Sequence, residues 1–161
     1  MAAPVKPVPP GYHTVTPYLT CSDTARAIDF YKKAFGAEET VLMHSPNGKV
    51  GHAEIRIGDS MVMLADEWPH NQARSPQSLG GSAVSIFLYV EDVDAVFGAA
   101  VKAGAKADHP PTDMFWGDRF AKLTDPFGHL WSVATHIEDV APEEMEKRAR
   151  AAMSQTAAQA S

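Results

Sequence analysis

Hydrophobic and polar residues alternate along much of the chain, and in two places the spacing changes to the three-to-four-residue period of an amphipathic helix. One helix is predicted between Asp23 and Gly36, and a second between Asp92 and Gly104. In each case the aspartate suits an N-cap, because its carboxylate accepts a free backbone N–H, and the glycine suits the position after the last turn. The two segments therefore predict two helices with matching ends.

Alternation with a period of two predicts eight strands. They are expected at 13–21, 38–45, 51–57 and 60–66 in the first half, and at 83–90, 106–113, 119–124 and 129–136 in the second. Two of them, 38–45 and 106–113, are less clearly defined, and His109-Pro-Pro111 is incompatible with a central strand because proline has no N–H to donate. After Asp139, acidic residues in the first turn and a stripe of Met145, Ala149 and Met153 predict a last helix.

The two halves look like copies of one unit. Asp23 and Asp92 are 69 residues apart, and Gly58 and Gly128 are 70 apart. Agreement between two landmarks indicates an internal duplication, in which each copy has the order β-α-β-β-β. The predicted organisation is an α+β domain at 12–137 with repeats at about 12–67 and 82–137, a disordered lead-in at 1–11, and a C-terminal helix and tail at 138–161.

Each strand presents one apolar face to the helices and leaves the opposite face for a cleft. That opposite face is rich in aromatic, hydroxyl and charged side chains, a mixture typical of a small-molecule pocket. The predicted ligand-binding residues on it are Thr16, Tyr18, His52, Glu54, Ser85, Phe87, Phe120, Lys122 and Ser132. Phe115 and Trp116 are predicted at the rim, with burial in the core as the alternative for both.

Composition narrows the classes of partner. The chain of 161 residues has a formal charge of -6, which disfavours nucleic acid and anionic lipid. With one cysteine, Cys21, it forms no intrachain disulfide, and no apolar run is long enough for a membrane span. A cytoplasmic protein is expected.

Two motifs give the chain a family resemblance. The first is Ser22-Asp23…Ile28-Asp-Phe-Tyr31…Phe35-Gly36, and the second is Thr124-Asp-Pro-Phe-Gly128-His-Leu-Trp131. Both resemble the glyoxalase/bleomycin-resistance/dioxygenase (vicinal oxygen chelate) superfamily, and the stretch from His52 to Asp66 is most similar to its PhnB-like branch. The resemblance implies a curved, partly closed mixed sheet around a cleft with the helices outside. It also implies a homodimer.

Enzymes of this superfamily chelate a divalent ion through four residues. Carried over by spacing, these positions fall on Thr16, Val62, Ser85 and Ser132. Hydroxyl and alkyl groups are poor substitutes for imidazole and carboxylate ligands, so no metal cofactor is predicted. If an ion binds, His52 and Glu54 are the expected ligands, since they lie two residues apart on one strand face.

The preferred hypothesis is a metal-independent protein that binds an aromatic or hydrophobic small molecule, for sequestration or detoxification. The alternative is a divalent-metal-dependent lyase, isomerase or dioxygenase that uses His52 and Glu54, and a third reading is a partner-binding module with a vestigial cleft. Whether the chain is an enzyme stays open at this point. Glu54 is the candidate catalytic residue, as a general base if burial raises its pKa.

Overall fold

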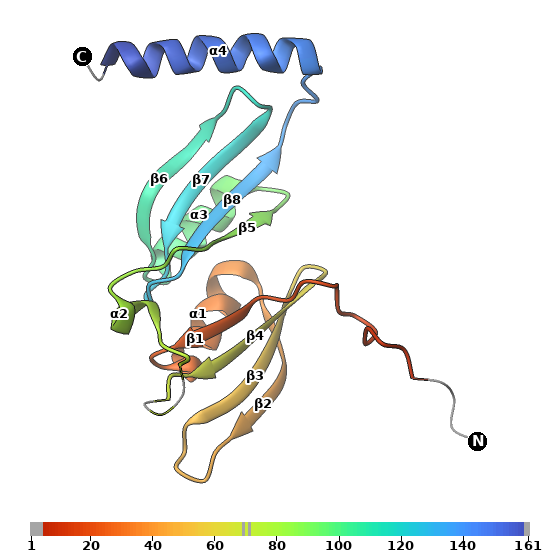
Figure 1. The fold of residues 1–161 in the computed structure, drawn as a ribbon, viewed down its shortest axis with the longest axis vertical. Helices are drawn as coiled ribbons and strands as arrows, with labels where there is room; N and C mark the ends of the chain where they lie inside the picture. The colour runs from red at the N-terminus through yellow and green to blue at the C-terminus, as the bar shows by residue number, and fades with distance from the viewer. Residues whose placement is uncertain (1–4, 69, 71, 160–161) are drawn as a thin grey trace.

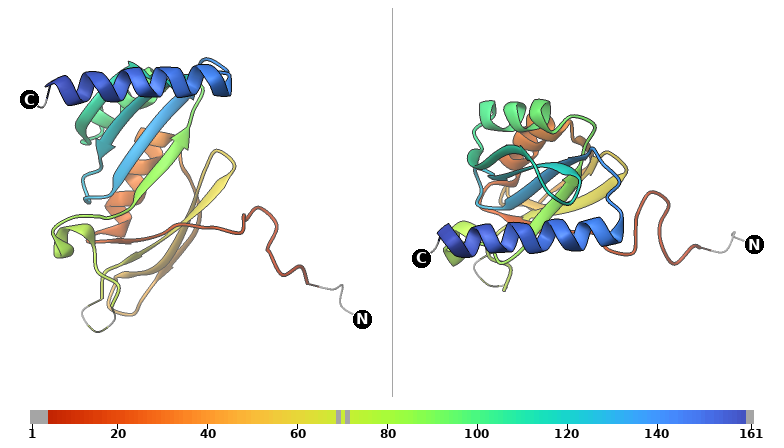
Figure 2. Two further views of the ribbon diagram at one scale, coloured as in Figure 1. Left: turned by 45° about the horizontal axis from the view of Figure 1, so that its top comes forward. Right: turned by 90° about the horizontal axis from the view of Figure 1, so that it is seen from above.

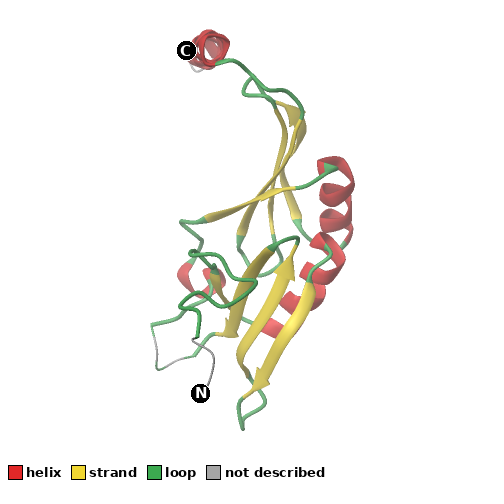
Figure 3. Ribbon diagram, turned by 90° about the vertical axis from the view of Figure 1, so that its right-hand side faces the viewer, coloured by secondary structure: helices red, strands yellow, loops and turns green. Residues whose placement is uncertain are grey.

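Two four-stranded sheets, one from each repeat, stand one above the other in the computed structural model, which describes residues 5–68, 70 and 72–159 (Figure 1). The strand orders are β1-β4-β3-β2 and β5-β8-β7-β6, so the two sheets have the same topology. Helices α1 and α3 cover one side of the sheets and leave the opposite side open (Figure 3). The predicted α+β class and the duplication are thereby confirmed.

The first repeat contains β1 (Tyr18–Cys21), α1 (Thr24–Phe35), β2 (Glu38–His44), β3 (Val50–Ile57) and β4 (Ser60–Asp66). The second contains β5 (Ser85–Tyr89), α3 (Val93–Lys102), β6 (Lys106–Asp113), β7 (Asp118–Thr124) and β8 (Leu130–His136). The short α2 (Pro76–Leu79) lies between the repeats, and α4 (Pro142–Gln159) follows them. Helix α4 lies across one end of the second sheet, at the opposite end of the molecule from the first sheet (Figures 1 and 2).

The register of the parallel pairs relates the two sheets residue by residue. Tyr18 pairs with Met63 in the first sheet, and Phe87 pairs with Ser132 in the second. The antiparallel pairs extend this equivalence, because Glu54 lies opposite Met63 and Lys122 lies opposite Ser132. Glu54 and Lys122 therefore hold equivalent positions in the two repeats.

The core joins the repeats through α1 and the last strand. Trp131 is 1% exposed, and its ring lies 5.3 Å from that of Tyr31 and 4.7 Å from that of Phe35. Asp125, in the turn between β7 and β8, accepts hydrogen bonds from the Tyr31 hydroxyl at 2.6 Å and from Trp131 Nε1 at 2.9 Å. One buried carboxylate thus ties the first repeat to the second.

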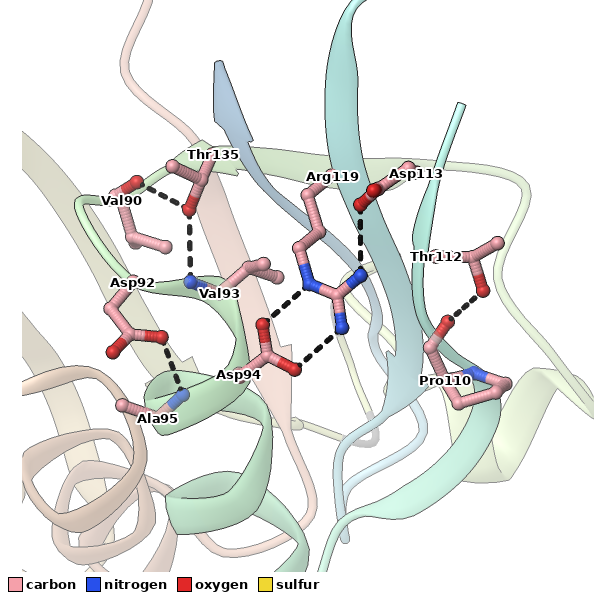
Figure 4. A network of polar contacts seen from close by, with 10 residues as sticks. All are labelled: Val90, Asp92, Val93, Asp94, Ala95, Pro110, Thr112, Asp113, Arg119 and Thr135. Carbon is pink, nitrogen blue, oxygen red and sulfur yellow. Dashed lines mark hydrogen bonds and ion pairs between the residues drawn. The ribbon is translucent and has the colours of Figure 1, made fainter. Parts of the chain in front are cut away.

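The start of α3 is fixed by polar contacts to its own sheet (Figure 4). Asp92 caps the helix by accepting from the Ala95 N–H at 2.9 Å, as the sequence predicted. Arg119 on β7 donates to both carboxylate oxygens of Asp94 and also to Asp113 on β6. A two-pronged contact of this kind holds the helix in a defined orientation on the sheet.

Most of the predicted strand ends are close to the observed ones, and two differences have clear causes. The first strand begins at Tyr18 rather than at residue 13. Of the segment 13–17, the last residue is bonded to the sheet, where the Met63 N–H donates to the Pro17 carbonyl oxygen. Strand β6 contains His109-Pro-Pro111 and is an edge strand whose register shifts there, as expected for a segment with two missing donors.

Candidate functional site

Four side chains on the open face of the first sheet form a continuous hydrogen-bonded series, here called the Glu54 chain: Tyr12, Glu54, His52 and Tyr18. The Tyr12 hydroxyl donates to Glu54 Oε2, and His52 Nε2 lies 3.0 Å from Glu54 Oε1. The Tyr18 hydroxyl lies 2.9 Å from His52 Nδ1. If Nε2 carries the proton and donates to the carboxylate, Nδ1 accepts from Tyr18, and every member of the series is satisfied.

The electrostatics of the Glu54 chain favour the carboxylate. Hydrogen bonds from Tyr12 and then His52 lower the pKa of Glu54 below its usual value, although its partial burial acts in the opposite direction. The same contact raises the pKa of Tyr12, and burial followed by the charge of Glu54 raises the pKa of Tyr18. The condition set for Glu54 as a general base, a pKa raised by burial, is therefore not met, because hydrogen bonding to the charged form outweighs desolvation here.

The open face of the second sheet carries a group of rings, here called the aromatic wall: Phe87, Tyr89, Trp116 and Phe120. Phe87 and Phe120 stack with their centres 5.8 Å apart, and Trp116 meets Phe120 edge-on at 5.7 Å. Phe87 is 47% exposed and Tyr89 is 66% exposed. Large apolar side chains gathered on an open face are typical of a binding surface.

Polar groups stand beside the aromatic wall. The hydroxyls of Ser85 and Ser132 lie 3.1 Å apart, and Lys122 Nζ lies 5.7 Å from the centre of the Phe120 ring. Phe115 packs edge-on against Trp116 at 5.1 Å, and both are half-buried. A cavity of about 1000 Å³ lies next to the wall and is lined by Phe87, Tyr89 and His136 among others.

A buried carboxylate organises one end of the aromatic wall. Asp118 is 4% exposed and accepts hydrogen bonds from the Tyr89 hydroxyl and Trp116 Nε1, each at 3.1 Å. His136 Nδ1 lies 2.8 Å from Asp118, and His136 Nε2 lies 2.9 Å from Asp139. Two of the four rings of the wall are thus held in place by one side chain.

The predicted site residues fall into two groups. The structure brings Tyr18, His52 and Glu54 together on the first sheet, with Thr16 lining a cavity beside Glu54. It brings Ser85, Phe87, Trp116, Phe120 and Ser132 together on the second, with Phe115 and Lys122 at their sides. The strand pairing of the described residues joins no strand of one sheet to the other, so each group lies on its own sheet.

Both the repeat and the sheet topology match a known family. The model of the Glyoxalase/Bleomycin resistance protein/Dioxygenase superfamily matches residues 12–133. The chain belongs to this superfamily. A protein of Mycobacterium bovis, Mb0911c, is 43% identical over 135 residues, which cover 82% of this chain and 89% of that protein.

Two solved structures have a fold similar to that of this chain. TioX from Micromonospora sp. ML1 has a TM-score of 0.61 and 26% identity, and the match covers 78% of this chain and 99% of that one. The PhnB protein from Bacillus cereus has a TM-score of 0.58 and 19% identity, over 76% of this chain and 99% of that one. At that level of identity the second likeness shows the fold alone.

The residues at the superfamily's chelating positions do not fit a divalent ion. The register places Met63, not Val62, opposite the first strand, and Val62 is buried in the core at 3% exposure. The carry-over of a chelating position to Val62 is therefore wrong, because the turn before β4 has two residues and the turn before β8 has five, so Gly58 and Gly128 do not hold equivalent positions and the counterpart of Ser132 is Met63. Thr16, Met63, Ser85 and Ser132 offer hydroxyls and one thioether, which are weak ligands for such ions.

No group of three or more His, Cys, Asp or Glu side chains suited to a metal occurs within residues 5–68, 70 and 72–159. His52 Nε2 and Glu54 Oε1, two atoms that would have to bind an ion held by these residues, are hydrogen-bonded to each other.

Two important residues were missed from the sequence, and one was misplaced. Tyr12 lies just after the predicted lead-in, and no pattern in the sequence signals its contact with Glu54. Asp118 was outside the predicted strand 119–124, although by alternation it shares a face with Phe120. The position of His129 directly after the turn glycine Gly128 predicts an exposed side chain, but His129 is 8% exposed, because its Nε2 lies 3.2 Å from the Thr20 carbonyl oxygen of the first repeat.

The His136 ring provides a test of the electrostatics at this end of the sheet. Hydrogen bonds to Asp139 and then to Asp118 raise the pKa of His136 above its usual value. A raised pKa in the folded state stabilises the fold fully below the unfolded pKa of about 6.5, and this contribution is lost as the pH rises through the folded pKa. We expect Asp139→Asn to lower the pKa of His136. NMR titration of the His136 ring protons measures this change. Asp59→Asn is the control, and an unchanged titration in Asp139→Asn would contradict the assignment.

Proposed function

We propose that this chain is a metal-independent protein that binds an aromatic or hydrophobic small molecule, in a sequestration or detoxification role. The observation that carries the proposal is the aromatic wall. Phe87 and Tyr89 expose much of their rings beside a cavity of about 1000 Å³. Phe120, which is 7% exposed, stacks against Phe87. A planar apolar ligand that stacks on these rings would remove the exposed ring surface of Phe87 and Tyr89, and the ligand's own contacting face, from water.

The groups beside the aromatic wall supply orientation. Lys122 offers a mobile ammonium at one side, and the Ser85 and Ser132 hydroxyls offer donors and acceptors at another. Asp118 holds the Tyr89 hydroxyl and the Trp116 indole N–H, so these rings need little reordering when a ligand arrives. Thr16, Tyr18, His52 and Glu54 form a second place of contact on the first sheet.

Ligand titration followed by Trp fluorescence tests the proposal. We expect a panel of aromatic and thiazole-bearing compounds to contain ligands that change the emission of Trp116. Phe87→Ala should weaken such a ligand about tenfold, since a lost ring contact and its apolar area are worth about 1.5 kcal/mol or more. Val101→Ala, which removes an exposed apolar side chain from α3, is the matched control.

Two results would overturn the proposed function. A broad panel that leaves the emission unchanged would contradict binding at the aromatic wall. Near-stoichiometric Zn, Ni, Mn or Fe in protein purified without chelators would instead favour a metal-dependent lyase, isomerase or dioxygenase with His52 and Glu54 as ligands.

We also infer a cytoplasmic homodimer of the PhnB-like branch. The support is the resemblance of the stretch from His52 to Asp66 to that branch. In the described part of the chain, no helix is long and apolar enough to cross a membrane. Sedimentation equilibrium measures the mass directly.

A further inference from the structure

Glu54 is a carboxylate without a matching cation. Its side chain is 13% exposed, and the ion pair found for it among the described residues is with His52, not with a Lys or Arg. The nearest arginine along the strand, Arg56, is engaged by Glu38. Tyr12 donates a neutral hydroxyl, so the hydrogen bonds are satisfied but the negative charge is balanced only if His52 is protonated. Sheltering a carboxylate from water is costly unless a positive group accompanies it.

A cavity lies directly beside this carboxylate. Its volume is about 510 Å³, and Glu54 and Met63 of the sheet form one side of it. The N-terminal segment forms the other side, with Val8, Pro9 and Tyr12 among its residues. The volume is within the range of about 300–1,000 Å³ that small-molecule sites have.

The cavity is apolar apart from a few groups, and those groups carry no fixed positive charge. Among the residues that line the cavity, His13 has the basic side chain, and its Nε2 lies 3.2 Å from the Asp59 carbonyl oxygen. That contact requires the nitrogen to donate, which directs it away from Glu54. A ligand in this cavity therefore meets one carboxylate, the hydroxyls of Tyr12 and two threonines, the His13 ring and apolar walls.

We propose that this cavity is a binding site for an organic ammonium ion with a compact apolar body. The ammonium group takes the place of the Tyr12 hydroxyl at Glu54 Oε2, and the apolar body lies between Met63 and the N-terminal segment. An ammonium–carboxylate hydrogen bond is stronger than a phenol–carboxylate one, which favours the exchange. The proposal rests on the function proposed above and deepens it, because Thr16 and Glu54 belong to the second place of contact named there. It names the class of ligand that this cavity takes, and the cavity lies apart from the aromatic wall.

Three probes of one shape separate charge from apolar binding: 2-phenylethylammonium, 2-phenylethanol and phenylacetate. With the full-length chain at pH 7, we expect calorimetry to show that the ammonium compound binds at least tenfold more tightly than the alcohol, and that phenylacetate binds least. Glu54→Gln keeps the size of the side chain and removes its charge, and it should abolish the preference for the ammonium compound. Glu143→Gln, the same change on exposed α4, should leave it intact.

Tyr12→Phe distinguishes a ligand site from a structural hydrogen bond. Because the Tyr12 hydroxyl competes with the ligand for Oε2, its removal should strengthen ammonium binding severalfold, whereas damage to a merely structural contact would weaken it. Thermal melting of each variant shows whether it is folded. A folded Tyr12→Phe variant that binds the ammonium compound more weakly would count against the proposed exchange.

The outcomes separate this proposal from the aromatic wall. Equal binding of the ammonium compound and the alcohol, or a preference that survives Glu54→Gln, overturns the ammonium site. The same is true of a preference that disappears in Phe87→Ala and persists in Glu54→Gln, because the probe would then be bound at the wall. Absence of binding by all three probes also overturns it, while the fluorescence panel tests the wall independently.

Discussion

Gly117→Ala is expected to destabilise the chain by about 2–5 kcal/mol, the sum of a backbone penalty and a steric one. Gly117 has a φ of +96°, which side-chain-bearing residues rarely adopt. A Cβ atom added there would lie 2.1 Å from the Glu138 carbonyl oxygen, which is backbone and has little room to move. Gly117 O also accepts from the N–H groups of Ile137 and Glu138, so a shift would break the junction between β8 and α4.

Urea denaturation measures this effect, and Gly98→Ala is the control. Gly98 lies inside α3, and no atom lies within 4 Å of a Cβ built there. Alanine at that position should stabilise the chain by about 0.5–1 kcal/mol, because it is the better helix former. A Gly117→Ala variant as stable as the wild type would contradict the close approach of residue 117 to the Glu138 carbonyl oxygen.

The same variant should lose ligand binding at the aromatic wall, because Trp116 is the adjacent residue.

Asp125→Ala should have an effect of similar size for a different reason. Asp125 is 4% exposed and accepts four hydrogen bonds, from Tyr31, Trp131 and the backbone N–H groups of Phe127 and His129. Each buried donor left without an acceptor costs about 1–3 kcal/mol, and with partial relaxation we expect a total of about 3–5 kcal/mol. The loss should appear in the midpoint of denaturant unfolding.

Two further variants make the Asp125 experiment specific. Tyr31→Phe keeps the ring in the core and removes one of the four donors, so about 1 kcal/mol is expected. Asp59→Ala removes an exposed carboxylate whose hydrogen bond is to the Ser60 hydroxyl, and it should change the stability by less than about 0.5 kcal/mol. If Asp125→Ala and Asp59→Ala were equally stable, the link between the repeats would not depend on Asp125.

The fate of Cys21 illustrates what alternation alone can predict. Alternation along the first strand predicts that Cys21 lies on the helix-facing side as a small buried hydrophobe, and its exposure is 0%. Burial, the largest cause, raises the pKa of its thiol far above the usual value, with nearby carboxylates adding to the shift. A thiol of this kind is a poor nucleophile, since reactivity depends on the thiolate. The period of two was enough for this result.

By contrast, contacts between distant segments had no counterpart in the local pattern. His129 was expected on the surface because it follows a turn glycine, yet it packs against the first repeat beside Cys21, 3.8 Å from the sulfur. Tyr12 reaches Glu54 across 42 residues of sequence. Neither contact follows from neighbouring residues, and the second is the main cause of the lowered pKa of Glu54.

The amino-acid sequence by itself determined the β-α-β-β-β duplication, the ends of both repeat helices and the face on which most strand side chains lie. These features follow from backbone periodicity and capping, which act over a few residues. Only the tertiary structure decided that the open faces form two sheets with separate side-chain groups, that Asp118 organises the aromatic wall and that Tyr12 completes the Glu54 chain. Such contacts depend on how whole elements pack, and residues far apart in the chain meet only when that packing is complete.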